Sequence, residues 1–179
     1  MTQLVIREAL IDDADDVAGV HVRSWQAAYL GLIDQKVLDE LSVADRADRW
    51  RSIIAEPLPT TLALLVAERD GEVVGWTSFG SGRDQDGAAD GEVYGIYADP
   101  AAWSTGIGHA LLAAAEERIA GAGHTRAYLW VLDGNVRADA FYEAHGWVAD
   151  GATKVEERPD VALAEHRRVK ELVRAPRVR

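Results

Sequence analysis

The chain has 179 residues, of which 48% are hydrophobic and 27% charged, and it contains no cysteine. This length and composition predict one globular domain with a full core, and they exclude disulfides, thiolate metal ligands and a covalent cysteine intermediate. The formal net charge of −11 argues against a nucleic-acid partner, because such binding depends largely on Lys and Arg side chains that neutralise phosphates. The same charge favours a cationic small partner, and solubility alone is the alternative explanation.

The sequence predicts neither a membrane-spanning nor a secreted chain. There is no run of about 18 apolar residues, and the opening stretch MTQLVIREALIDD turns acidic where a signal peptide would stay apolar. We therefore expect a cytoplasmic protein without a membrane partner. The one basic cluster, HRRVKELVRAPRVR (166–179), predicts a strand followed by a basic tail rather than a nucleic-acid arm.

The first third of the chain predicts one strand followed by helices. Residues 4–10 alternate as a strand does, and residues 12–33 carry apolar side chains at helical spacing behind an acidic start. We expect this long helix to end near Gly31. Shorter helical patterns follow around 37–41 and over 43–54, the second with a serine placed to cap its N-terminus.

The rest of the chain alternates strands and helices. Residues 61–80 hold two β-rich runs around the dipeptide Asp70-Gly71, which is a strong hairpin signal. The later predicted elements are strands at 92–98 and 125–132, helices at 105–123 and 135–145, and two closing strands within 147–155 and 167–173. A strand, a helix and a strand in succession imply a parallel pair with a right-handed crossover.

A turn with two glycines, STGIGH (104–109), lies between a predicted strand and a predicted helix. A helix N-terminus leaves several backbone N–H groups without partners, and glycine lets a phosphate approach them. The turn therefore predicts an anion cradle, with a tight turn that binds nothing as the alternative. A dinucleotide fingerprint is not met, because its third glycine would fall at Leu111, and no Lys-Ser/Thr pair completes a P-loop.

Two motifs together are more specific than the turn alone. The pattern P-x-x-W-x-x-G-x-G spans 100–108, and N-x-x-A-x-x-x-Y-x-x-x-G-W spans 135–147. They resemble the two signature regions of the GNAT acetyltransferase superfamily, and the order of predicted elements agrees along essentially the whole chain. The resemblance implies a single acetyltransferase domain over 1–179 with an α/β fold. Its sheet would be mixed, mostly antiparallel, of about six to seven strands, splayed centrally and flanked by helices.

The resemblance also implies an activity. It implies an N-acetyltransferase that transfers the acetyl group of acetyl-CoA directly to a primary amine of a small molecule or peptide. A non-catalytic acyl-CoA-binding sensor module is the alternative. A weaker rival is a nucleotide-binding protein that uses the same turn for another pyrophosphate. The sequence leaves the oligomeric state undecided, and a homodimer is one alternative, since dimers are common among closed homo-oligomers.

By resemblance, the turn would hold the pyrophosphate of coenzyme A and the strand before it would pair with the pantetheine arm. The residues so assigned are Ile96, Tyr97 and Ala98 on the strand, Ser104, Thr105, Gly106, Ile107, Gly108 and His109 in the turn, and Asn135, Ala138 and Tyr142 on the following helix. One feature departs from the family pattern. Trp103 stands where Gln or Arg is usual, and no basic residue occupies positions 104–105. This departure affects phosphate binding by the side chains of the turn. Phosphate binding by its backbone N–H groups does not depend on these side chains.

Two residues are assigned to proton transfer by resemblance. Asn135, Ala138 and Tyr142 share one helical stripe, so Asn135 would bond the pantetheine arm while Tyr142 protonates the leaving thiolate. A phenol is protonated at neutral pH and can act as such an acid. The alternatives are a helix N-cap for Asn135 and a core position for Tyr142. Glu92 would take the proton of the acceptor ammonium, directly or through water, with Asp90 as its substitute and a solvent-facing strand end as the alternative.

The acceptor side is less specific. Trp25 and Tyr29, at i and i+4, resemble the substrate-side wall of some family members, with plain core packing as the alternative. Acidic residues in RDQDGAADGE and EERPD hint at a cationic acceptor. The five histidines show no metal-ligand spacing, so we expect no metal.

Overall fold

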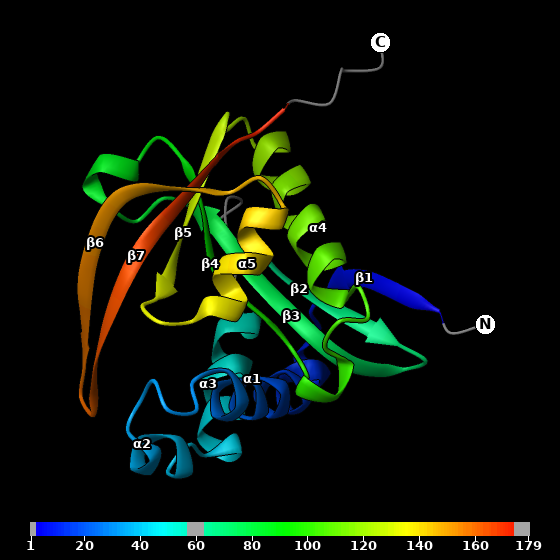
Figure 1. Ribbon diagram of the computed structural model, residues 1–179. Coiled ribbons are helices and arrows are strands. Elements are labelled where there is room, and N and C mark those ends of the chain that lie inside the picture. Colours follow the sequence, from blue (N-terminus) through cyan, green and yellow to red (C-terminus); the bar gives the residue numbers. More distant parts are fainter. Residues whose placement is uncertain (1–2, 57–62, 174–179) are drawn as a thin grey trace.

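A seven-stranded mixed sheet flanked by helices forms the fold in the computed structural model, which describes residues 3–56 and 63–173 (Figure 1). The strands are β1 (Leu4–Glu8), β2 (Ala63–Arg69), β3 (Glu72–Ser81), β4 (Gly91–Ala98), β5 (Arg126–Leu132), β6 (Val148–Arg158) and β7 (Val161–Glu171). The helices are α1 (Ala14–Ala28), α2 (Gln35–Asp39), α3 (Val43–Ala55), α4 (Ile107–Gly121) and α5 (Val136–Ala144), with short 3-10 turns η1 (Ile11–Asp13), η2 (Gln85–Gly87) and η3 (Pro100–Ala102). The end of the predicted basic tail, 174–179, lies outside the described residues.

The sheet order is β1-β2-β3-β4-β5-β7-β6. Only β4 and β5 pair in parallel, and every other neighbouring pair is antiparallel. β7 lies between β5 and β6, so the last hairpin folds back into the sheet as the long orange and red ribbons of Figure 1. The predicted fold class is therefore confirmed.

The sheet splays between β4 and β5. The two strands share only the pairs Gly91↔Ala127 and Glu92↔Tyr128. Beyond them β4 continues along β3, with a register shift that leaves Tyr94 as the extra residue of a bulge. The edge of β4 that faces β5 thus loses its partner after Glu92. This confirms the central splay that the resemblance implied.

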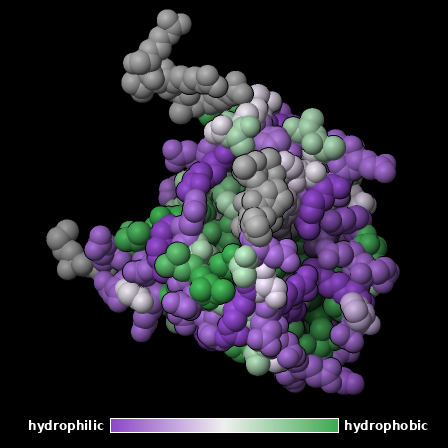
Figure 2. Space-filling model, turned by 180° about the vertical axis from the view of Figure 1, so that it is seen from behind, coloured by the Kyte–Doolittle hydropathy of each residue, from purple (hydrophilic) through white to green (hydrophobic). Residues whose placement is uncertain are grey.

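Helices cover both faces of the sheet. On β3, Gly75 lies against Ile107 and Leu111 of α4, whereas the adjacent Trp76 packs with α1 and α3. Because successive strand residues point to opposite faces, α4 lies on one face and α1 with α3 on the other. Seen from behind, the surface is mainly hydrophilic with scattered hydrophobic areas, as the charge predicts (Figure 2).

Several element boundaries differ from the sequence-based predictions. The first strand ends at Glu8 rather than at residue 10, because the Leu10 N–H binds the Asp13 carboxylate at 2.7 Å. The long helix ends at Ala28, and Gly31 has a φ of +78°, which a right-handed helix excludes. The last two strands run longer than expected and meet at a tight turn between Arg158 and Val161.

Several local predictions are confirmed. The Ser42 side chain caps α3 by accepting the Asp45 N–H at 3.2 Å. Asp70 and Gly71 both have positive φ, at 54° and 88°, in the turn that joins β2 to β3. Within residues 3–56 and 63–173, no helix is long and apolar enough to cross a membrane.

Candidate active site

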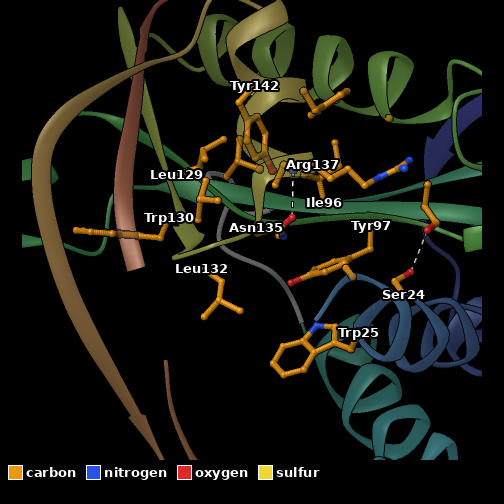
Figure 3. Close-up of a pocket in the computed structure, with 18 of the residues that line it drawn as sticks. Ser24, Trp25, Ile96, Tyr97, Leu129, Trp130, Leu132, Asn135, Arg137 and Tyr142 are labelled. Carbon is orange, nitrogen blue, oxygen red and sulfur yellow. Dashed lines mark hydrogen bonds between the residues drawn. The ribbon is translucent and has the colours of Figure 1, made fainter. Parts of the chain in front are cut away.

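A cavity of about 630 Å³ fills the space between the separating strands β4 and β5 (Figure 3). The turn before α4, the first residues of α5, helix α1 and the inner faces of β6 and β7 complete its wall. The cavity therefore lies where the splay of the sheet separates the two strands. Most residues assigned to the cofactor, and both residues assigned to the acceptor, line this cavity.

The glycine turn forms one end of the cavity. Gly106 is the N-cap of α4 and has a φ of +89°, a left-handed conformation that favours glycine. The first hydrogen bond of the helix runs from the Ala110 N–H to the Gly106 carbonyl at 3.0 Å. The N–H groups of residues 107–109 therefore have no intrahelical acceptor, and the positive end of the helix dipole lies there. The turn therefore has the unpaired backbone N–H groups that an anion cradle requires, and binding of an anion there stays a prediction.

The side chains of the turn point in different directions. Ser104, Gly106, Gly108 and His109 line the cavity. Thr105 donates to the Ala102 carbonyl at 2.6 Å, and Ile107 is only 1% exposed within the core. Thr105 and Ile107 could therefore contribute to the cradle through their backbone but not through their side chains.

Cations reach the turn from other elements. The guanidinium carbon of Arg137, on α5, lies 3.8 Å from the centre of the Trp103 ring, and the indole N–H of Trp103 donates to the Ala98 carbonyl at 2.9 Å. Arg69, on β2, donates to the Thr105 hydroxyl at 2.8 Å. The sequence analysis missed both arginines. Arg137 lies two residues after Asn135, inside a motif already recognised, and that position was the available signal.

The β4 wall is formed by Ile96, Tyr97 and Ala98, which line the cavity next to the unpaired edge. The Ala98 carbonyl also accepts a hydrogen bond from Ser24 at 3.0 Å, drawn as a dashed line in Figure 3. Helix α1 and the glycine turn are thereby both attached to the end of β4. The strand edge and the cradle consequently have fixed positions relative to each other.

Helix α5 supplies the opposite wall through Asn135, Ala138 and Tyr142. The Asn135 side-chain oxygen Oδ1 accepts the Ala138 N–H at 3.1 Å, so the N-cap interpretation is confirmed, and the side-chain NH₂ group stays available to a ligand. Tyr142 projects from α5 between Leu129 and Ile96 (Figure 3). Burial raises the pKa of Tyr142, and none of the described residues accepts a hydrogen bond from its hydroxyl.

Glu92 lies at the narrow end of the cavity and is 1% exposed, so the solvent-facing interpretation is wrong. Arg83 binds both of its oxygens, through Nε at 3.0 Å and Nη2 at 2.6 Å. The Arg83 backbone N–H and the Tyr128 hydroxyl add further bonds at 3.0 and 2.9 Å. Asp90 pairs with Arg126 at 3.1 Å and does not line the cavity. Both candidate bases are therefore ion-paired.

Trp25 and Tyr29 form part of the far end of the cavity and also pack in a hydrophobic cluster. Their rings meet edge to face at 5.0 Å, and the Tyr29 hydroxyl hydrogen-bonds to that of Tyr97 at 2.8 Å. The core interpretation is thus confirmed for these residues, and their role as a wall for the substrate stays a prediction. Beside them lie four charged side chains that the sequence analysis missed, Lys154, Glu156, Arg158 and Glu165. Lys154, Glu156 and Arg158 are spaced two residues apart on β6, so their side chains share one face of the strand, and this spacing could have indicated a charged wall.

Comparison with known proteins now decides the family. Residues 23–147 match the model of the acetyltransferase (GNAT) family. The chain belongs to this family. It is 32% identical over 142 residues, 79% of each chain, to the uncharacterized N-acetyltransferase YuaI of Bacillus subtilis strain 168. As a member of this family, the protein is an acyltransferase.

Solved structures agree on the fold. A GCN5-related N-acetyltransferase from Rhodopseudomonas palustris superposes with a TM-score of 0.75 at 21% identity, covering 94% of this chain and 95% of that one. The acetyltransferase yncA from Salmonella typhimurium, solved with acetyl-CoA, gives a TM-score of 0.69 at 16% identity, covering 99% and 98%. At these identities the two proteins share the fold of this chain.

The acidic stretch RDQDGAADGE of this GNAT protein does not present free carboxylates to the cavity. Asp86 and Asp150 pair with Arg167 at 2.8 and 2.9 Å. Asp90 pairs with Arg126, as described above. Asp86, Asp90 and Glu92 of RDQDGAADGE thus form ion pairs within the fold. In EERPD, Glu156 pairs with Arg158 at 2.9 Å and lines the cavity. In the part of the chain that the structure describes, no cluster of three or more His, Cys, Asp or Glu side chains could hold a metal.

Proposed function

We propose that this protein is an N-acetyltransferase that uses acetyl-CoA and transfers the acetyl group directly to a primary amine of a small molecule or peptide. One observation carries the proposal: a single cavity joins the helix N-terminus at Gly106, the unpaired edge of β4 and the hydroxyl of Tyr142. A long ligand with an anionic end and an amide-containing arm fits such a cavity, because each part meets groups of matching chemistry.

The cradle would hold the pyrophosphate. Backbone N–H groups of 104–109 would donate to its oxygens, with the helix dipole favouring the negative charge. Arg137 supports this assignment, because it lines the cavity beside the turn and supplies the positive charge that positions 103–105 lack. An arginine suits phosphate oxygens because several of its N–H groups can donate at once.

The middle of the cavity would hold the pantetheine arm and the acetyl group. The unpaired edge of β4 at Ile96–Ala98 can extend the sheet by pairing with the amides of the arm, and the Asn135 NH₂ can meet them from the other side. A backbone N–H on this edge would stabilise negative charge on the acetyl oxygen in the transition state. Tyr142 stays protonated at neutral pH because burial raises its pKa, and it would give its proton to the leaving sulfur.

The acceptor ammonium must lose a proton to a base before its nitrogen can attack the acetyl carbon. The family resemblance predicts Glu92 as this base, which would accept the proton of the ammonium directly or through water. Its carboxylate is neutralised by Arg83, so accepting a proton would require this ion pair to weaken. Direct transfer is favoured over a covalent intermediate on cysteine, because the chain has no cysteine.

The test is release of the coenzyme thiol from acetyl-CoA. Because the protein contains no cysteine, a thiol reagent reports the free coenzyme without a protein background. The purified chain is given acetyl-CoA and a panel of an amino acid, a polyamine, an amino sugar and a peptide with a free N-terminus. We expect release to depend on at least one amine, with the acetylated amine visible by mass spectrometry. Release that no amine accelerates would contradict the proposal.

A further inference from the structure

Glu165, on β7, has an unusual environment for a carboxylate. Its side chain is 12% exposed, and its Oε2 atom is shielded from water with no hydrogen-bond partner among the described residues. The nearest cation is Lys154, whose Nζ lies 3.6 Å from this oxygen, too far for a good hydrogen bond. Buried polar atoms are nearly always hydrogen-bonded, and exceptions often mark functional sites.

The sheet order places Glu165 at the acceptor end of the cavity. In the register, Glu165 pairs with Leu132, the last residue of β5, and with Lys154 of β6. It lines the cavity together with Tyr97, which comes from β4 on the other side of the splay. The ionisable groups that face it are Lys154, Glu156 and Arg158 on β6, Tyr29 directly after α1, and Tyr97 on β4. A ligand between the separated strands would therefore pass between Glu165 and the edge of β4.

Glu92 and Glu165 differ in what they can offer an ammonium group. Arg83 contributes its charge and three hydrogen bonds to Glu92. Glu165 Oε2 instead accepts no hydrogen bond from the described residues, and Lys154, its ion-pair partner at 3.6 Å, also lies 4.3 Å from the centre of the Trp130 ring. Burial raises the pKa of Glu165, which brings the group closer to the neutral range where a general base works best.

We propose that Glu165 binds the primary ammonium of the acceptor and takes its proton. This proposal rests on the function proposed above and adds the acceptor-side residue. The ammonium gives one proton to the Glu165 carboxylate, and the nitrogen lone pair then bonds to the acetyl carbon. The carbon–sulfur bond breaks with its electron pair on sulfur, and the thiolate takes the Tyr142 proton. The nitrogen gives up its second proton, which restores the phenol through solvent, while Glu165 returns its proton to water.

The first test measures ammonium binding without turnover. n-Butylammonium is titrated calorimetrically into the wild-type chain and the Glu165→Gln variant, each with and without coenzyme A. The control is Glu157→Gln, the same change of charge on β6 at an exposed position outside the cavity. We expect binding to the wild type and to the control within about twofold, and at least about tenfold weaker binding to Glu165→Gln, the loss of a hydrogen bond to a charged group. Equal binding to the wild type and Glu165→Gln, or none to the wild type, would overturn the proposal.

The second test separates Glu165 from Glu92 by the pH dependence of turnover. With the amine that gives the fastest thiol release, we expect Glu165→Gln to lower kcat/KM for the amine by about 100-fold or more. The acid limb of its pH profile should disappear, while the KM for acetyl-CoA stays within about twofold. An acid limb that Glu92→Gln removes and Glu165→Gln leaves would overturn the proposal. Absence of turnover in the wild type would refute the proposed function. The butylammonium titration would still test whether Glu165 binds an ammonium group, because it needs no turnover.

Discussion

The hydroxyl of Tyr128 donates a 2.9 Å hydrogen bond to Glu92 Oε2, at the last residue pair that β4 and β5 share. The same hydroxyl accepts the backbone N–H groups of Arg83 and Asp84 at 2.8 and 3.0 Å. Tyr128 therefore joins the two strands and the loop before β4 at the point where the sheet opens. This phenol and the Arg83–Glu92 ion pair together hold the closed end of the cavity.

Replacing Tyr128 with Phe should destabilise the fold. The change removes a donor and an acceptor from a buried position, and leaving such partners unpaired costs about 1–3 kcal/mol. Urea denaturation measures the free energy of unfolding. Tyr94→Phe is the matched control, because its half-buried hydroxyl makes one hydrogen bond, to the Ser81 carbonyl. Equal losses in the two variants would show that Tyr128 has no special role at the splay.

Replacing Tyr142 with Phe should lower kcat and leave cofactor binding unchanged. The phenyl ring keeps the packing of α5, while the proton for the leaving sulfur is lost, and general acids contribute about 100-fold or more. Thiol release gives kcat, and calorimetry gives the dissociation constant of acetyl-CoA, which should change by less than about twofold. An unchanged kcat would remove the acid role from Tyr142.

Replacing Arg137 with Gln should weaken acetyl-CoA binding by about tenfold, or about 1.4 kcal/mol, because the cradle loses a charged hydrogen-bond donor. The loss should shrink as ionic strength rises, since salt screens exposed charges. Arg118→Gln is the control, because Arg118 pairs with Glu8 and lies outside the cavity. If both variants bind acetyl-CoA alike, the charge near the pyrophosphate comes from elsewhere.

His21 should make the fold sensitive to mild acid. Its ring packs among Trp25, Trp50, Trp76 and Tyr97, and burial lowers its pKa to about 3. Above about pH 6.5 the imidazole is neutral in both the folded and unfolded states. As the pH falls below that value, only the unfolded state binds the proton, so stability decreases by up to about 1.4 kcal/mol per pH unit until the folded pKa is reached.

The variant His21→Phe tests this pH dependence. Between about pH 7.5 and pH 5, the wild type should lose about 2 kcal/mol more of its free energy of unfolding than the variant does. Urea denaturation at both pH values measures the difference. Parallel losses in the two proteins would mean that His21 is not the group responsible.

The cofactor side of the cavity could be predicted because its signals are local. Gly106, Asn135 and Tyr142 belong to short motifs whose spacing fixes their relation on one turn or one helix face. The central splay came from family resemblance, because a short parallel pairing of β4 and β5 leaves no mark in composition or periodicity.

The acceptor side could not be predicted because its residues meet only in three dimensions. Glu165 and Tyr97 approach each other because β7 inserts between β5 and β6, a choice of strand order that the alternation of β7 does not encode. The surroundings of Glu92 could likewise be predicted only in part from the sequence. Its position at the start of a strand was predictable, whereas its ion pair depends on how the loop before β4 folds Arg83 back over it.

The central claim is that the cavity between β4 and β5 holds acetyl-CoA with its pyrophosphate on the turn at Gly106. The most direct test is calorimetric titration of the wild-type chain with acetyl-CoA and, separately, with S-acetyl-pantetheine, which lacks the pyrophosphate and the adenosine. We expect saturable binding of acetyl-CoA at one site per chain, and binding of the truncated compound that is weaker by at least about 100-fold, or about 2.7 kcal/mol. Equal affinity for the two compounds, or no binding of acetyl-CoA, would contradict the account.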